Sequence, residues 1–185
     1  MPRSSDKRER LVEAARDLIH RQGYKRTSLA DISRESGVPL GNVYYYFKTK
    51  DDIAAAVIAG RRQEFETLYQ TLESETDPRA RLQAWLKALA RHRRSVASHG
   101  CPVGSLCQEL NKERTPLARQ ADGLLRFQLD WATEQFRLMG RRDAAALGRQ
   151  LIAGLQGASL LAHALQDPGV FHEAIQRQQA WLDEF

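Results

Sequence analysis

The chain has no long apolar run and little cysteine. No stretch of about 18 consecutive apolar residues, the length that spans a bilayer, occurs in its 185 residues. The chain begins with polar and charged residues, unlike a secretory signal. Its two cysteines, Cys101 and Cys107, are too few for a disulfide framework. These absences exclude a membrane span and a disulfide-stapled scaffold, and they lead us to expect a cytoplasmic protein with no membrane partner.

Alternating apolar and polar residues, which predict β-strands, are absent as well. Nearly every segment instead repeats its apolar residues with a helical period. Glycine and proline positions divide the chain into about nine helices, expected over residues 5–22, 28–36, 39–46, 50–74, 77–98, 105–111, 115–139, 142–166 and 168–185. The predicted fold is therefore all-α, with a three-helix head and a helical body.

The excess positive charge lies at one end of the chain. Residues 1–50 contain 11 Lys and Arg against 6 Asp and Glu, whereas residues 51–185 contain 17 of each. A basic segment followed by a neutral one is typical of a phosphate-binding head joined to a body that does not bind nucleic acid. We therefore predict a DNA-binding domain at 1–50 and a ligand-binding and dimerisation domain at 51–185. A basic segment that is merely exposed to solvent would show the same excess of positive charge in residues 1–50. A purely structural helical adaptor, the other alternative, gives no reason for this excess to lie at one end.

Two short predicted helices, 28–36 and 39–46, are joined by a turn that contains glycine, which indicates a helix-turn-helix. Thr27 or Ser28 is placed to cap the first of them, and Asp31 supplies an acidic partner in its first turn. In such a unit the second helix enters the major groove of duplex DNA while the first braces it.

The outward face of that second helix has three adjacent tyrosines, which a soluble protein has little reason to expose. Their hydroxyls donate to phosphate oxygens and their rings lie against sugars and base edges, although an aromatic cluster packed on the first helix is an alternative. Gly41 permits close approach, while Lys48 and Lys50 favour a phosphate. The candidate DNA-binding residues are Thr27, Ser28, Leu40, Gly41, Asn42, Tyr44, Tyr45, Tyr46, Lys48 and Lys50.

The runs GYKRTSLADI (23–32) and GVPLGNVYYYFKTKD (37–51) resemble the signature of the TetR family of transcriptional regulators. The likeness covers residues 8–55, and beyond them only the number and lengths of the helices agree. It implies a homodimer on a palindromic operator in double-stranded DNA, released by a small-molecule inducer that changes the spacing of the two heads.

The resemblance also implies individual roles. Thr27 is expected to contact a phosphate. Leu40, Gly41 and Tyr45 are expected to approach base edges, and Tyr44, Tyr46 and Lys50 are expected to contact the DNA backbone. Family members that read bases strongly often have a polar residue in place of Leu40. Contact with a thymine methyl, or DNA shape, is therefore expected to contribute to specificity.

The helix expected over 142–166 contains Gly148, Gly154 and Gly157 among leucines and alanines. A glycine inside a helix costs about 1 kcal/mol relative to alanine, so their presence indicates that another helix approaches closely. The resemblance assigns this helix and the last one, with Ile175 and Trp181, to a four-helix dimer interface. A close crossing within one chain is the alternative.

A mostly apolar pocket is expected between helices of the body. The candidate lining residues, each of which also fits a plain core position, are Trp85, Leu89, His92, Cys101, Leu106, Cys107, Phe127, Gln128 and Trp131. Some members of the family have a reactive cysteine in the segment of Cys101, and the basic residues nearby would favour a thiolate. A redox or electrophile sensor of the same architecture is therefore an alternative, and a bridge between Cys101 and Cys107 stays open.

Catalytic motifs are missing from the sequence. It contains no phosphate-binding glycine loop, nucleophile elbow or helical pair of metal-binding histidines, and its histidine and cysteine spacing matches no usual zinc pattern. We expect no metal, no cofactor and no enzymatic activity; Cys107 with a histidine would be the one candidate for thiol catalysis. The predicted function is a ligand-responsive transcriptional regulator that represses by occupying its operator.

Overall fold

The computed structural model describes residues 4–185 and contains helices but no strand over that range. This confirms the predicted all-α class. The predicted domain 1–50 begins with residues 1–3, which lie outside the described residues. The ten helices of the described range are α1 (Ser4–Gln22), α2 (Leu29–Ser36), α3 (Leu40–Tyr46), α4 (Lys50–Leu72), α5 (Pro78–Ala90), α6 (Arg93–His99), α7 (Gly104–Leu110), α8 (Pro116–Leu138), α9 (Ala144–Ala164) and α10 (Pro168–Leu182).

The chain folds into two compact units. The first consists of Met1–Gln63 and Ser105–Leu124, and the second of Glu64–Gly104 and Leu125–Phe185. The chain therefore passes from one unit to the other three times, within α4, at the start of α7 and within α8. The first unit is discontinuous in sequence, because α7 and the beginning of α8 belong to it.

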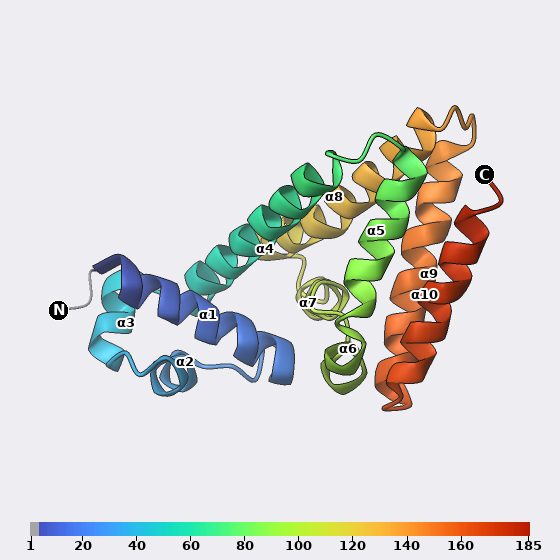
Figure 1. The fold of residues 1–185 in the computed structure, drawn as a ribbon. Helices are drawn as coiled ribbons and strands as arrows, with labels where there is room; N and C mark the ends of the chain where they lie inside the picture. Colours follow the sequence, from blue (N-terminus) through green and yellow to red (C-terminus); the bar gives the residue numbers. More distant parts are fainter. Residues whose placement is uncertain (1–3) are drawn as a thin grey trace. The chain divides into compact units, whose positions relative to one another are not determined.

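The first unit has the amphipathic pattern that the sequence predicts. α2 packs against α1 and α3 packs against α2 (Figure 1). One stripe of α1 faces inward, as expected for apolar residues at helical spacing. Buried apolar side chains of α1 to α4 include Leu11, Ala15, Leu18, Ile19, Ile32, Val43, Ile53 and Val57.

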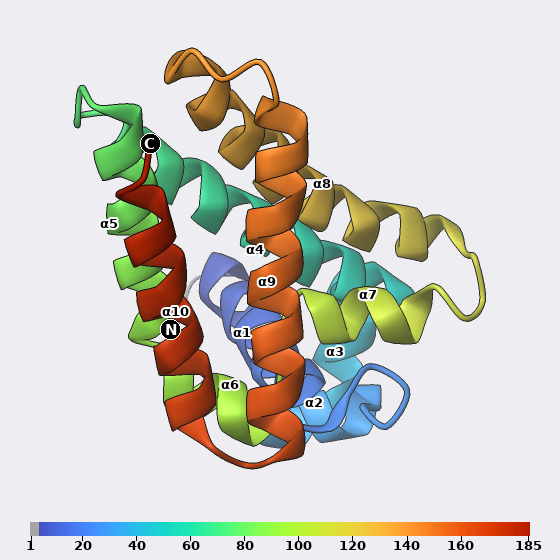
Figure 2. The ribbon, with the colours of Figure 1, turned by 90° about the vertical axis from the view of Figure 1, so that its right-hand side faces the viewer.

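The second unit is built around one apolar cluster. α10 packs against α5, α6 and α9, and both ribbon views show α9 and α10 side by side (Figure 1 and Figure 2). The most deeply buried large side chains of this cluster are Leu82, Trp85, Leu86, Phe136, Leu151, Ile175 and Leu182. No helix in the described part of the chain is both long and apolar enough to cross a membrane.

The single helix expected over 77–98 is in fact two helices, α5 and α6. At the break, the N–H of Arg91 donates to the carbonyl of Ala88 (3.3 Å) and the N–H of His92 donates to that of Leu89 (3.0 Å). This spacing of three residues tightens the last turn and ends α5. Neither glycine nor proline stands at the break, so the sequence pattern contains no signal for it.

Candidate nucleic-acid interface

The turn between α2 and α3 is fixed by hydrogen bonds on both sides. Gly37 ends α2 in the left-handed conformation (φ 64°), which favours glycine. The guanidinium of Arg10 donates to the carbonyl of Ser36 (2.5 Å) at that helix end. The hydroxyl of Ser33 donates to the carbonyl of Val38 (2.7 Å) across the turn. These bonds satisfy carbonyl groups in and around the turn and hold the start of α3 in place.

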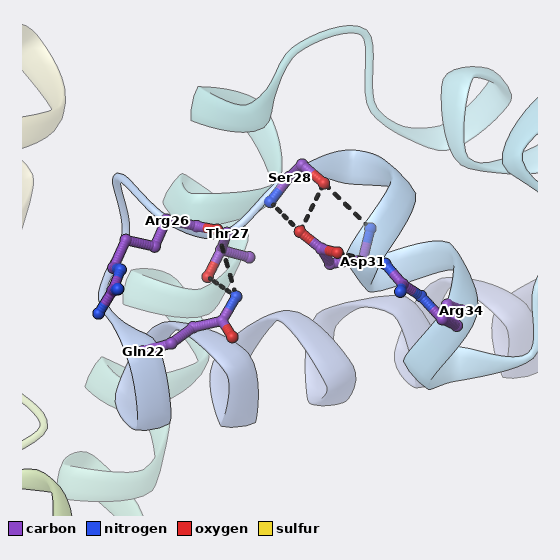
Figure 3. Close-up of polar contacts among 6 residues, drawn as sticks. All are labelled: Gln22, Arg26, Thr27, Ser28, Asp31 and Arg34. Atoms are coloured by element: carbon purple, nitrogen blue, oxygen red, sulfur yellow. Dashed lines mark hydrogen bonds and ion pairs between the residues drawn. The ribbon is translucent and has the colours of Figure 1, made fainter.

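The start of α2 is held by a capping box, as the spacing of Ser28 and Asp31 predicts (Figure 3). The N–H of Asp31 donates to the Ser28 hydroxyl (3.1 Å), and the N–H and hydroxyl of Ser28 donate to the Asp31 carboxylate (3.0 and 2.6 Å). These donors lower the pKa of Asp31, and the neighbouring guanidinium of Arg34 lowers it further. Ser28 is therefore the N-cap residue.

α3 presents tyrosines to solvent above an apolar base. Val43 and Phe47 are buried, as their spacing of four residues predicts. Tyr45 is 75% exposed and Tyr44 is 48% exposed, whereas Tyr46 is half-buried and meets the Tyr45 ring edge-on at 5.0 Å. The side chains of Tyr44 and Tyr45 are therefore largely exposed to solvent and are not part of the apolar core.

The first turn of α3 is open. Leu40 and Gly41 are exposed and Asn42 is half-buried. A methyl group added at Gly41 would meet nothing within 4 Å. No neighbour within the chain therefore requires glycine at this position.

The phosphate contact expected of the Thr27 side chain does not fit the structure. Thr27 is only 1% exposed. Its hydroxyl donates to the carbonyl of Gly23 (2.8 Å). The side-chain amide of Gln22 donates to that hydroxyl (3.4 Å) and to the carbonyl of Arg26 (3.3 Å) (Figure 3). The side chain of Thr27 therefore stabilises the turn before α2.

Lys50 is also used within the chain. Its ammonium donates to the carbonyls of Tyr24 (3.1 Å) and Lys25 (3.3 Å) and lies 4.2 Å from the centre of the Tyr24 ring. Two of the three donors of this ammonium are thus directed to the turn before α2, and the phosphate contact expected of Lys50 stays a prediction. Lys48, in contrast, is exposed, and its ammonium reaches only the carbonyl of Tyr44 one turn earlier (2.9 Å).

The turn from Gly23 to Lys25 depends on two carboxylates that sequence reasoning missed. The N–H groups of Tyr24 and Lys25 donate to the two oxygens of Glu109 (2.8 and 2.7 Å). The Tyr24 hydroxyl donates to Asp51, and burial together with this carboxylate raises the pKa of Tyr24. Separations of 85 and 27 residues leave no local pattern that could have indicated either contact.

Three of the candidate ligand-binding residues come together in the second unit. The rings of Trp85 and Trp131 lie 5.6 Å apart, and Tyr69 stacks on Trp131 at 4.2 Å and lies 5.4 Å from Phe127. Trp85 and Trp131 are 1% and 8% exposed, and their indole Nε1 atoms have no hydrogen-bond partner. Buried N–H groups are usually paired, so this aromatic cluster contains two donors that lack an acceptor.

The other candidate ligand residues lie in different surroundings. Leu106 and Cys107 belong to the first unit, where the Cys107 thiol donates to the carbonyl of Ala121 (3.2 Å). Leu89 is half-buried, Gln128 is buried and His92 is exposed. Both cysteines are free thiols.

Cys101 is half-buried, and its sulfur accepts from the Gly104 N–H (3.3 Å) and from the Gln156 amide (3.6 Å). Its role as an electrophile sensor stays a prediction. In the part of the chain that the structure describes, no three His, Cys, Asp or Glu side chains are grouped so that they could hold a metal ion.

The glycines of α9 fall into two kinds. Methyl groups at Gly148 and Gly154 would both meet atoms of the same chain. At Gly148 these include the backbone of Thr133 on α8 (3.1 Å), so this glycine permits a close crossing within the chain, whereas at Gly154 they belong to the end of the Gln178 side chain on α10. Gly157 faces open space. The expected interface residue Ile175 is instead 1% exposed in the core of its own chain, and Trp181 packs on Phe136 at 5.7 Å.

An exposed apolar stripe remains at the C-terminal end of α9. Its large members, Leu160, Leu161 and Leu165, are 60%, 54% and 64% exposed. Gly157 and Ala164 are exposed on the same helix at the three- and four-residue spacing of one helix face. Three of the four exposed large apolar side chains in the described part of the second unit lie on this stripe, whereas Ile175 is buried.

A braced helix-turn-helix with an open, tyrosine-bearing second helix defines a DNA-binding transcriptional regulator. Residues 11–57 match the family model described as bacterial regulatory proteins, tetR family. The HTH-type transcriptional regulator LmrA of Bacillus subtilis (strain 168) is 30% identical over 164 residues, which cover 84% of this chain and 86% of LmrA. The chain belongs to the TetR family of transcriptional regulators.

Two further comparisons extend over nearly the whole chain. The HTH-type transcriptional repressor DhaR of Mycobacterium sp. (strain GP1) is 29% identical over 191 residues, which cover 96% of this chain and 87% of DhaR. A TetR-family regulator from Agrobacterium tumefaciens has a TM-score of 0.85 at 26% identity, covering 96% of this chain and 97% of that one. These relatives are transcriptional regulators, which confirms that the protein is not an enzyme.

Proposed function

We propose that the protein is a repressor that binds a palindromic operator as a homodimer and is released by a small-molecule inducer. Residues 1–50 act as the DNA-binding domain and residues 51–185 as the ligand-binding and dimerisation domain, in the cytoplasm where the operator lies. The single observation that carries the proposal is the exposed tyrosine face of α3 above its buried base of Val43 and Phe47. The name of the relative DhaR, a transcriptional repressor, supports repression.

On this proposal α3 lies in the major groove. Leu40, Gly41 and Tyr45 approach base edges, because they are the exposed positions of the first turn and the most exposed tyrosine. The side chains of Ser28, Asn42, Tyr44, Tyr46 and Lys48 contact the sugar-phosphate backbone. Thr27 and Lys50 also hold the turn before α2.

The homodimer forms through the stripe on α9. Three large leucine side chains that face solvent in one chain would be removed from water by the same stripe of a second copy, as a two-fold interface requires. Burying one leucine side chain stabilises by about 1.5 to 3 kcal/mol, so the stripe provides the main apolar contribution. Two heads about 34–36 Å apart then reach successive major grooves on one face of the DNA.

The inducer binds at the aromatic cluster of the second unit. Two buried indole N–H groups without acceptors favour a flat, apolar ligand that presents hydrogen-bond acceptors to Trp85 and Trp131. The remaining positions of the proposed site, all in the second unit, are Leu89, His92, Cys101, Phe127 and Gln128.

The dye anilinonaphthalene sulfonate is a suitable probe of this site. We expect it to quench tryptophan fluorescence, and we expect Trp85→Phe or Trp131→Phe to weaken its binding while Trp181→Phe leaves it unchanged. Equal binding by all three variants would place the ligand elsewhere.

The deciding experiment compares Tyr45→Ala, Tyr45→Phe and the wild type on the chain's own upstream DNA at low salt. Because Tyr45 is 75% exposed, both variants should keep the wild-type fold and mass in solution. Tyr45→Ala should lose operator binding, and Tyr45→Phe separates the contribution of the hydroxyl from that of the ring. Undiminished affinity of Tyr45→Ala would refute the assignment of α3 as the reading helix.

A further inference from the structure

The turn between α1 and α2 is held by two opposite charges from distant parts of the first unit. The Glu109 carboxylate accepts the N–H groups of Tyr24 and Lys25, one on each oxygen, at 2.8 and 2.7 Å. The Lys50 ammonium donates to the carbonyls of the same two residues, at 3.1 and 3.3 Å. Charge-assisted bonds of this kind are the stronger class of hydrogen bond. The main-chain N–H groups of Tyr24 and Lys25 are thus bound by the Glu109 carboxylate, and their carbonyl groups are bound by the Lys50 ammonium.

Gly23 makes room for the carboxylate. Its φ of 87° lies in the left-handed region, and a methyl group there would come within 3.0 Å of Glu109 Oε2. The exposed ion pair of Lys25 with Glu113 (2.7 Å) is a second link to the same turn, and the Glu113 carboxylate raises the pKa of Lys25. Exposed pairs of this kind contribute little to stability, so Glu109 is the principal link.

Glu109 stands on α7, the helix at which the chain passes from the second unit into the first. Gly104, the first residue of α7, belongs to the second unit, where its N–H donates to the sulfur of Cys101 and a methyl group on it would collide with the Gln156 side chain. Ser105 and the rest of the helix, with Glu109, belong to the first unit. The start and the end of one short helix are therefore anchored in different units.

We propose that Glu109 is a positioning residue for operator binding, and that its carboxylate passes a displacement at the start of α7 to the turn that leads into α2. The inference rests on the proposed function, since it presumes that α2 and α3 form the reading unit. The turn continues directly into Thr27 and the cap residue Ser28, so moving Tyr24 and Lys25 moves the beginning of α2. α3, which packs on α2, follows.

The first test measures amide hydrogen exchange and operator affinity in the full-length protein. In Glu109→Ala we expect exchange at Tyr24 and Lys25 to rise, and operator affinity to fall, about tenfold or more at a temperature where the variant is folded. Glu109→Gln keeps one acceptor oxygen and should show a smaller effect of the same sign. Glu113→Gln, the matched loss of one exposed charge beside the same turn, should leave both quantities near wild type.

The second test asks whether the displacement is passed on, and it uses a double-mutant cycle on operator affinity. Gly104→Leu places a bulky side chain where a methyl group already comes within 3.3 Å of Gln156 Cδ and 3.5 Å of Cys101 Cβ, so it displaces the start of α7. Its effect should be clear when Glu109 is present and largely absent in the Glu109→Ala background. Additive effects of the two changes would overturn the coupling. If Glu109→Ala fails to fold, the same cycle with Glu109→Gln decides the question.

Two outcomes separate this inference from the proposed function. If the wild type binds no duplex at low salt, the proposed function fails, and with it the positioning role. If the wild type binds and Glu109→Ala binds equally well, whether or not exchange at Tyr24 and Lys25 has risen, the positioning role fails while the function stands.

Discussion

Gly41 is a residue whose small size has no explanation inside its own chain. Its added methyl group would find open space, and alanine is the better helix former by up to about 1 kcal/mol. We therefore predict that Gly41→Ala raises the free energy of unfolding while it weakens operator binding about tenfold or more, by the cost of a clash at a base edge. Urea unfolding and a binding titration on the same samples give the two numbers.

Gly60 provides the matched control. It lies exposed within α4, and a methyl group there also meets nothing within 4 Å. Gly60→Ala should stabilise the protein by a similar amount and leave operator affinity unchanged. If both variants keep wild-type affinity, Gly41 is not close to DNA.

For single residues, the sequence predicted the burial of apolar side chains better than it predicted the contacts of polar side chains. Val43, on the inner face of α3, and Phe47, the residue that follows this helix, are both buried, as their spacing of four residues predicts. Thr27 and Lys50 were assigned to DNA because of their chemistry and their place beside the helix-turn-helix. Both bind main-chain carbonyls, and the partners of Lys50 lie 25 and 26 residues away. Such contacts depend on how the helices pack, which periodicity does not specify.

At the scale of the elements, α2 has only eight residues, so its first turn makes up a large part of the helix. Ser28→Ala removes the side-chain acceptor for the Asp31 N–H and should lower the free energy of unfolding by about 1 kcal/mol. The variant should also lose the largest of the causes that lower the pKa of Asp31, the hydrogen bond from the Ser28 hydroxyl, so this pKa should rise toward its ordinary value. Urea unfolding at neutral pH measures the first effect, and NMR titration of the carboxyl group measures the second.

The pH dependence has a definite sign. Because the pKa of Asp31 is lower in the folded state than its ordinary value of 3.8, its contribution to stability is complete above that value and is lost as the pH falls through the folded pKa. Wild type should therefore lose more stability than Asp31→Asn between about pH 5 and pH 2. Parallel losses in the two proteins would show that the carboxylate contributes nothing to the cap.

Helix boundaries were predictable wherever a capping residue, glycine or proline marks them. Asp77 with Pro78 begins α5 and Asp167 with Pro168 begins α10, as the sequence indicates. The break between α5 and α6 was missed because nothing in that stretch opposes a helix. The glycines of α9 could be assigned to close approach but not to a partner, since an intrachain crossing and a dimer require the same small residue.

In the whole molecule, exposed large apolar side chains gather in two places. Of the seven in the described residues, Leu40, Tyr44 and Tyr45 lie on α3, Leu160, Leu161 and Leu165 lie at the end of α9, and Leu138 stands apart on α8. Grouped apolar exposure marks interaction surfaces, whereas a single exposed leucine needs no explanation. The two groups correspond to the proposed DNA surface and the proposed dimer surface.

We predict that Leu161→Glu converts the dimer to a folded monomer and weakens operator binding, because two buried carboxylates would face each other across the two-fold axis. Light scattering with size-exclusion chromatography measures the mass. Leu138→Glu, the same change at an equally exposed leucine, should leave both mass and affinity unchanged. A dimer that survives Leu161→Glu would move the interface away from α9.

The discontinuity of the first unit has a consequence for hybrid regulators. A reading head excised at residue 50 or 63 and fused to the body of a relative leaves behind Ser105–Leu124, and with it the carboxylate that the Tyr24 and Lys25 amides require. Such a chimera would keep every base-reading side chain and still lack part of the support that orients them. Transplanting operator preference between relatives therefore calls for two grafts, the N-terminal helices together with the α7 segment.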